Sequence, residues 1–89
     1  MNYLQVAGLD DLKARSNGEN AFECFIQLNY GARSYKRILY NEGGKEETWW
    51  IANEIDDTEE NFSSDEDMLE KTNIGLALKS GALWYQINN

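Results

Sequence analysis

The strongest constraint on the fold is a two-residue alternation of side chains that begins at Phe22. From there to Tyr30, every second position is apolar or aromatic: Phe22, Cys24, Ile26, Leu28 and Tyr30. Successive side chains of a strand point to opposite faces of a sheet, so this spacing predicts a strand with one buried face. A sheet is therefore expected at the centre of the fold.

Two further strand-like runs follow this alternation, each bounded by turn residues. Residues 31–34 predict a turn, residues 35–40 a second strand, and residues 41–45 another turn. Residues 48–55 predict a third strand rich in aromatic and β-branched side chains. One face of that strand carries Trp49, Ile51 and Ile55. Consecutive strands joined by short turns predict an antiparallel meander.

Helices are predicted on both sides of the meander in the sequence. Leu9 and Leu12, with Asp10 and Asp11 between them and the cations Lys13 and Arg15 after them, predict a helix over roughly 4–16 that ends at Asn17-Gly18. After Ile55 we expect an acidic loop. A short helix is then predicted through Met68 and Leu69, with Ser63 or Ser64 in capping-box spacing to Glu66 or Asp67.

The last part of the chain predicts one more helix and one more strand. Residues 73–81 have helical spacing of apolar side chains and end in Lys79-Ser80-Gly81, and residues 82–87 alternate again. The predicted fold class is α+β: an antiparallel sheet of three to four strands, meander plus C-terminal strand, with two to three short helices packed on one side. Residues 1–89 are predicted to form a single domain, because so short a chain buries only ~60–65% of its unfolded surface.

The absence of histidine excludes several kinds of site. A Ser-His-Asp triad, a Cys-His nucleophile pair and His-ligated zinc all need an imidazole. The lone Cys24 cannot form an internal disulfide and is predicted to be a small buried hydrophobe. The carboxylates of residues 56–70 lack the central glycine and the ligand spacing of an EF-hand. We therefore predict a protein that is not an enzyme and has no metal or cofactor.

The chain also lacks an apolar run of the ~20 residues that a bilayer requires and a basic, apolar leader. With a single cysteine and no pair for a disulfide, we expect a cytoplasmic protein with no membrane contact.

Charge is the feature that most directly indicates a function. Net charge is −8, and residues 46–70 carry eleven acids and no base. Such a surface repels nucleic acid and attracts basic proteins. We predict that it imitates a phosphate track and binds a basic protein, such as a nucleic-acid-binding enzyme, as a DNA-mimic inhibitor does. The predicted partner-binding residues are Glu54, Asp56, Asp57, Glu59, Glu60, Asp65, Glu66, Asp67 and Glu70.

Two alternatives stand beside this prediction. An acidic segment also keeps a small domain in solution without recruiting any partner. A positive region, residues 31–45, places Arg33, Tyr35 and Arg37 at two-residue spacing on one face of the second strand. Arginine interleaved with tyrosine holds phosphate or stacks on a base, so these three residues predict a small-ligand site. The same residues also suit a charged strand edge that resists aggregation.

Several segments together resemble a family of small uncharacterised bacterial proteins that are often encoded in prophages and mobile elements. The resemblance covers roughly residues 22–85 and lies in the runs 25–31, 33–34, 53–60 and 73–83. It carries no catalytic motif. It implies a phage accessory protein or a host-defence inhibitor. A structural component of a virion or mobile element is a third possibility. We expect a monomer or weak homodimer, since net charge opposes self-association while open strand edges favour it.

Overall fold

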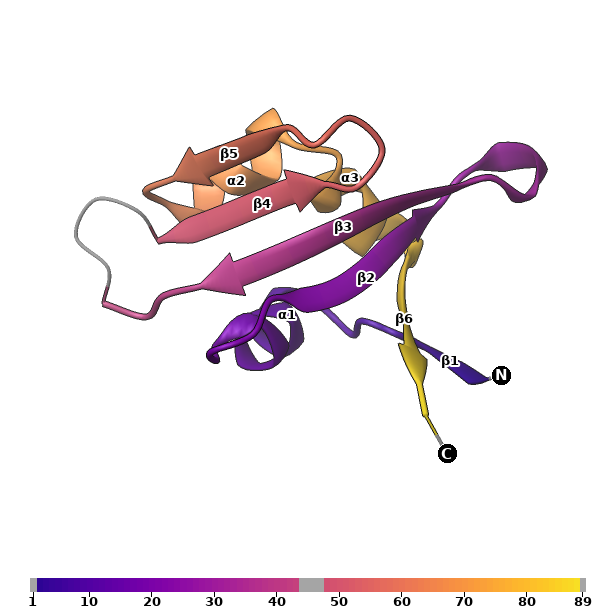
Figure 1. The fold of residues 1–89 in the computed structure, drawn as a ribbon, viewed down its shortest axis with the longest axis horizontal. Coiled ribbons are helices and arrows are strands. Elements are labelled where there is room, and N and C mark those ends of the chain that lie inside the picture. Colours follow the sequence, from indigo (N-terminus) through magenta and orange to yellow (C-terminus); the bar gives the residue numbers. More distant parts are fainter. Residues whose placement is uncertain (1, 44–47, 89) are drawn as a thin grey trace.

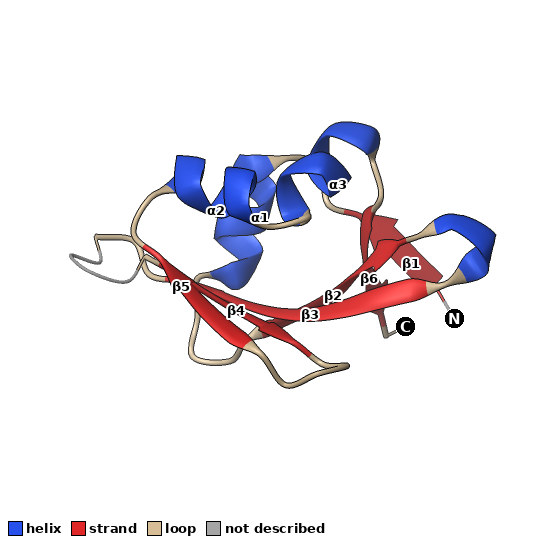
Figure 2. Cartoon of the chain, turned by 90° about the horizontal axis from the view of Figure 1, so that it is seen from above, coloured by secondary structure: helices blue, strands red, loops and turns tan. Residues whose placement is uncertain are grey.

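The computed structural model describes residues 2–43 and 48–88. Within them, six strands form one antiparallel sheet in the order β1-β6-β2-β3-β4-β5 (Figure 1). The strands are β1 (Asn2–Gln5), β2 (Phe22–Gln27), β3 (Arg33–Tyr40), β4 (Trp49–Asn53), β5 (Glu59–Phe62) and β6 (Leu83–Ile87). Three helices, α1 (Leu9–Ser16), α2 (Asp65–Lys71) and α3 (Ile74–Ser80), cover one face of the sheet (Figure 2). The α+β class is confirmed, but three to four strands understate the sheet.

The predicted meander forms the middle of this sheet. β2 pairs with β3 and β3 with β4, both antiparallel. β2 ends earlier than predicted because residues 29–31 form a 3₁₀ turn in which Tyr30 has a φ of 63°. Leu28 and Tyr30 are therefore exposed instead of sharing the buried face of Cys24 and Ile26. The turn predicted over 41–45 lies partly outside the described residues, because Gly44 and Lys45 are not among them.

The third predicted strand also ends early. β4 stops at Asn53, and the side chain of Ile55 is 79% exposed, whereas Trp49 and Ile51, predicted to share its face, are buried. A turn follows in which Asp57 has a φ of 55°. This turn returns the chain along β4 as β5, where the sequence predicted only a loop.

The N-terminal prediction was wrong in part, because residues 2–5 are a strand and not the first turn of a helix. β1 pairs with β6, with Tyr3 opposite Gln86 and Leu4 opposite Tyr85. The helix begins only at Leu9, where the Asp11 side chain accepts a 2.9 Å hydrogen bond from the Ala7 N–H. Pairing between the two ends of the chain overrides the local helical spacing, and a sequence window around Leu4 does not contain the partner strand.

The core lies between the helices and the covered face of the sheet. Large side chains of α1, β3, β4, α2, α3 and β6 are fully buried there: Leu12, Ile38, Trp49, Met68, Ile74 and Leu83. Burying a side chain of this kind stabilises the fold by ~1.5–3 kcal/mol. α2 and α3 approach closely at Gly75, where a Cβ atom would meet the carbonyl oxygen of Leu69.

The end of α3 follows the prediction. Gly81 adopts the left-handed conformation, with a φ of 69°, and the last strand follows it directly. None of the helices in the described residues is long and apolar enough to span a membrane.

Candidate functional site

Most of the predicted acidic residues lie along one edge of the molecule. β5 is the last strand of the sheet, the β4–β5 connection leads into it, and α2 packs against it (Figure 1). We call this region the acidic edge. Its carboxylates belong to Asp56, Asp57, Glu59, Glu60, Glu66, Asp67 and Glu70. The turn, the strand and the helix at this end of the sheet thus all carry carboxylates.

The strand of the acidic edge carries carboxylates on both of its faces. Glu59 lies opposite Ala52, and Glu60 lies opposite Ile51 on the helix-covered face. Both glutamates are exposed. Because β5 is an edge strand, the outer row of its backbone groups lies outside the ladder, and charged side chains there oppose pairing with an unrelated sheet.

The carboxylates of the acidic edge have little compensation from cations. Among the described residues, their only ion pair joins Lys71 Nζ to Asp67 Oδ2 at 3.9 Å. Both side chains of that pair are largely exposed, so it contributes only ~0–1 kcal/mol. Glu46 and Glu47 belong to the same acidic run but lie outside the described residues. The acidic edge is therefore a surface of largely uncompensated negative charge.

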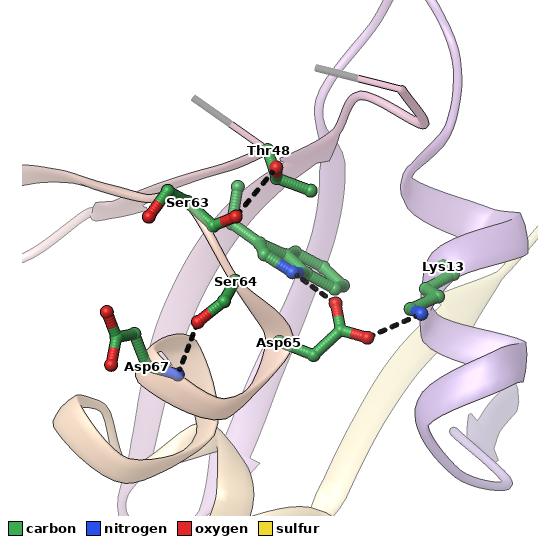
Figure 3. Close-up of polar contacts among 7 residues, drawn as sticks. Lys13, Thr48, Ser63, Ser64, Asp65 and Asp67 are labelled. Carbon is green, nitrogen blue, oxygen red and sulfur yellow. Dashed lines mark hydrogen bonds and ion pairs between the residues drawn. The ribbon is translucent and has the colours of Figure 1, made fainter. Parts of the chain in front are cut away.

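Asp65 differs from its neighbours, because its carboxylate is used inside the fold. Oδ2 lies 2.6 Å from Lys13 Nζ of α1, and Oδ1 accepts a 2.9 Å hydrogen bond from the indole N–H of Trp49 in β4 (Figure 3). Burial raises the pKa of Asp65, but the contacts with Lys13 and Trp49 together hold that pKa below its ordinary value. Asp65 thus joins α1, α2 and β4 through its two carboxylate oxygens.

The start of α2 is fixed by the second of the two predicted caps. The Ser64 hydroxyl accepts a 3.1 Å hydrogen bond from the Asp67 N–H, and Thr48 Oγ1 donates to the Ser63 carbonyl oxygen at 3.1 Å (Figure 3). A serine cap of this kind satisfies a backbone donor that the helix leaves unpaired. The acids of α2 are therefore presented by an anchored helix.

Two further predicted acids differ in position. Asp56 Oδ1 accepts hydrogen bonds from the Thr58 hydroxyl at 2.8 Å and from the Thr58 N–H at 3.2 Å, and these contacts lower the pKa of Asp56. Glu54, the first residue of the β4–β5 connection, is not counted in the acidic edge because it lines a cavity. Its N–H donates to the carbonyl oxygen of Tyr35 at 3.2 Å, and its side chain lines a cavity over β2 and β3.

The predicted arginine site is only partly assembled. The Arg33 guanidinium lies over the rings of Tyr3 and Phe25, at 4.7 and 4.4 Å from their centroids. Its N–H groups also donate to the hydroxyls of Tyr35 and Tyr3, and these bonds raise the pKa of Arg33. Arg33 is thus held by aromatic side chains of its own chain.

Arg37 points to a different neighbour. It lies 5.9 Å from the centroid of the Trp50 ring and has no ion pair within the described part of the chain. Lys36 falls on the opposite face, as predicted, and donates a hydrogen bond to Asn53. The three residues Arg33, Tyr35 and Arg37 share a face but do not converge on one point.

Cys24 is 3% exposed and belongs to the core, which confirms the prediction of a small buried hydrophobe. Burial raises the pKa of its thiol to about 12. In the described ranges, no three acidic or cysteine side chains are grouped so that they would hold a metal ion.

No family model, curated protein or solved structure matched the chain. The resemblance to small prophage and mobile-element proteins therefore stays a prediction, and function is argued from geometry alone.

Sequence reasoning missed two groups of residues. The first is Lys13 and Trp49, which engage Asp65 from other elements. The one signal in the sequence is that a buried tryptophan usually finds a partner for its N–H. The second group lines the cavity beside Glu54 and includes Tyr3, Glu23 and Gln86. These residues come from three strands, and no local pattern connects them.

Proposed function

We propose that this protein is a small non-enzymatic interaction protein that binds a basic surface of a partner protein through its acidic edge. The observation that supports this proposal is the uncompensated charge: carboxylates of β5, the preceding turn and α2 share one edge, with Lys71 as their only ion-pair partner in the described residues. Like charges held together on a folded surface repel one another, and a cationic partner relieves that repulsion.

The anchoring of these elements favours binding over a purely solubilising role. β5 is fixed by its ladder with β4, and α2 is fixed by its Ser64 cap and by the contacts of Asp65. Carboxylates on an ordered strand and helix bind a complementary surface with less loss of conformational entropy than carboxylates on a flexible tail. We infer that the partner presents lysine or arginine side chains in a groove, as nucleic-acid-binding proteins do.

Affinity capture with two matched variants tests the proposal. One variant neutralises the acidic edge with Glu59→Gln, Glu60→Gln and Glu66→Gln. The control neutralises three exposed carboxylates elsewhere with Asp10→Asn, Glu19→Gln and Glu42→Gln, so both variants have the same net charge. Capture is compared at about 0.05 and 0.5 M salt, because screening shortens the range of surface electrostatics roughly threefold between these concentrations.

The proposal predicts one class of captured protein that is basic, is retained by the wild type and the control variant, and is lost both with the acidic-edge variant and at high salt. Duplex DNA added as a competitor should release it if the bound surface is a nucleic-acid groove. Capture of the same proteins by both variants would overturn the proposal, because it would show that position on the edge does not matter.

A further inference from the structure

A cavity of about 370 Å³ opens over β2 and β3 beside the two chain ends. The β2–β6 ladder pairs Phe25 with Trp84 and Ile26 with Leu83, and beyond these pairs β6 turns away from β2 (Figure 1). The cavity lies beside this divergence. Its lining residues are Tyr3, Glu23, Cys24, Phe25, Tyr35, Glu54, Gln86 and Asn88. Its volume falls in the roughly 300–1,000 Å³ range of small-molecule sites.

The lining of this cavity is anionic. It includes two carboxylates, those of Glu23 and Glu54, and no lysine or arginine. Within the described residues, neither carboxylate forms an ion pair. Arg37 lies opposite Glu23 in the β2–β3 ladder, but its guanidinium lies near the ring of Trp50, which belongs to β4. Arg33 is likewise held over rings and does not line the cavity.

The aromatic part of the lining also suits a cation. The Phe25 ring meets Tyr3 edge-on at a centroid distance of 5.6 Å and Tyr35 at 5.5 Å. The faces of such rings attract cations. The Arg33 guanidinium already lies over Tyr3 and Phe25, so among these lining rings Tyr35 is the one that a bound cation would stack on. Gln86 and Asn88 bring amide groups to the cavity, whose oxygens accept hydrogen bonds from N–H donors.

We propose that this cavity binds an organic guanidinium. A planar guanidinium stacks on aromatic rings and donates paired hydrogen bonds to a carboxylate, so one group satisfies both kinds of lining residue. The cation is either a small free molecule or an arginine side chain of another protein. The ligand proposed for this cavity is a cation, whereas the site predicted at Arg33, Tyr35 and Arg37 would hold an anionic phosphate. It does not depend on the acidic edge, because neither Glu23 nor Glu54 belongs to that region.

Titration of the ¹⁵N-labelled full chain, followed by NMR, tests the proposal with agmatine and an acetylated, amidated Ala-Arg-Ala peptide as probes. The expected result is saturable shifts confined to amides of residues 3, 23–25, 35, 54 and 86. Glu23→Gln with Glu54→Gln should weaken binding at least about tenfold, the change that follows when a charge-assisted contact is lost. Glu59→Gln with Glu60→Gln is the control and should bind as the wild type does.

The variant Arg37→Gln distinguishes a cationic ligand from an anionic one. Removing this cation, whose residue lies opposite Glu23 in the β2–β3 ladder, should strengthen guanidinium binding, whereas a phosphate site would be weakened. Tighter binding of the peptide than of agmatine would identify a protein side chain as the occupant, and equal binding would identify a free small molecule. If the double variant loses the wild-type spectrum, Glu23→Gln and Glu54→Gln are tested singly.

Three results would overturn the proposal. The first is no saturable shift with either probe. The second is equal binding of the acetylated, amidated peptide with citrulline in place of arginine, in which a neutral urea replaces the guanidinium, which would show that charge is not recognised. The third is a cavity response to inorganic phosphate that Arg37→Gln abolishes, which would assign the face to an anion.

Discussion

Two parts of one seven-residue helix use the same type of side chain in opposite ways. At the first position of α2, the Asp65 carboxylate contacts Lys13 and Trp49 and joins three elements. Glu66 and Glu70 of the same helix are exposed and, within the described residues, form no ion pair. The first carboxylate stabilises the fold, whereas the others face solvent. The comparison shows that the count of acids over 46–70 mixes structural residues with residues free to meet a partner.

Among the substitutions that test this difference, Asp65→Asn should have the largest effect on the free energy of unfolding. The variant keeps the size of the side chain but loses the charge that Lys13 faces, so the free energy of unfolding should fall by about 1.5–3 kcal/mol. Glu66→Gln, one residue later, should leave stability unchanged or slightly higher. Urea unfolding of both variants measures the difference. Equal effects of the two substitutions would contradict the distinction drawn here.

The same contrast predicts a dependence on pH. The folded-state pKa of Asp65 lies below its unfolded value, so its contribution is present above the unfolded value of about 3.9 and is lost as pH falls through the folded pKa. The stability difference between wild type and Asp65→Asn should therefore be largest near pH 7 and shrink in acid. A constant difference from pH 7 to pH 2 would show that the carboxylate acts through shape and not charge.

Ser64→Ala tests how firmly the acidic helix is held. The hydroxyl of Ser64 satisfies the Asp67 N–H at the start of α2, and removing such a cap costs about 1 kcal/mol. The exposed Ser63, whose side chain makes no capping bond in the described residues, is the matched control. If Ser63→Ala is the more damaging change, the capping assignment is wrong.

Neutralising the acidic edge should have the smallest effect on the fold, and in the opposite direction. The variant with Glu59→Gln, Glu60→Gln and Glu66→Gln should be more stable than wild type by a few tenths of a kcal/mol at low salt, because repulsion between exposed charges is weak and screened. The gain should vanish in high salt. A loss of stability at either salt concentration would mean that these carboxylates have partners within the fold.

Much of the fold follows from the sequence. The meander from Phe22, the helix ending at Gly81 and the last strand were predicted, because alternation, helical spacing and a glycine stop are local signals. β1 was taken for helix because its partner strand lies at the other end of the chain. β5 was taken for loop because its Glu59-Glu60-Asn61 run has low strand propensity and, at an edge, needs no apolar alternation.

The site was predictable in composition but not in arrangement. Nine acids were predicted as one surface, yet Asp65 is used by the core and Glu54 lies at the cavity, since both depend on contacts with distant residues. The cavity itself arises where β6 leaves β2, which no spacing in the sequence indicates.

The most direct test of the proposed function is the affinity for a captured basic partner as a function of salt, measured for the wild type, the acidic-edge variant and the control variant of equal net charge. We predict that the wild type and the control lose affinity steeply as salt rises, and that the acidic-edge variant binds weakly at every concentration with a shallower slope. Equal affinities and slopes for the two variants would contradict the account, because only total charge would then matter.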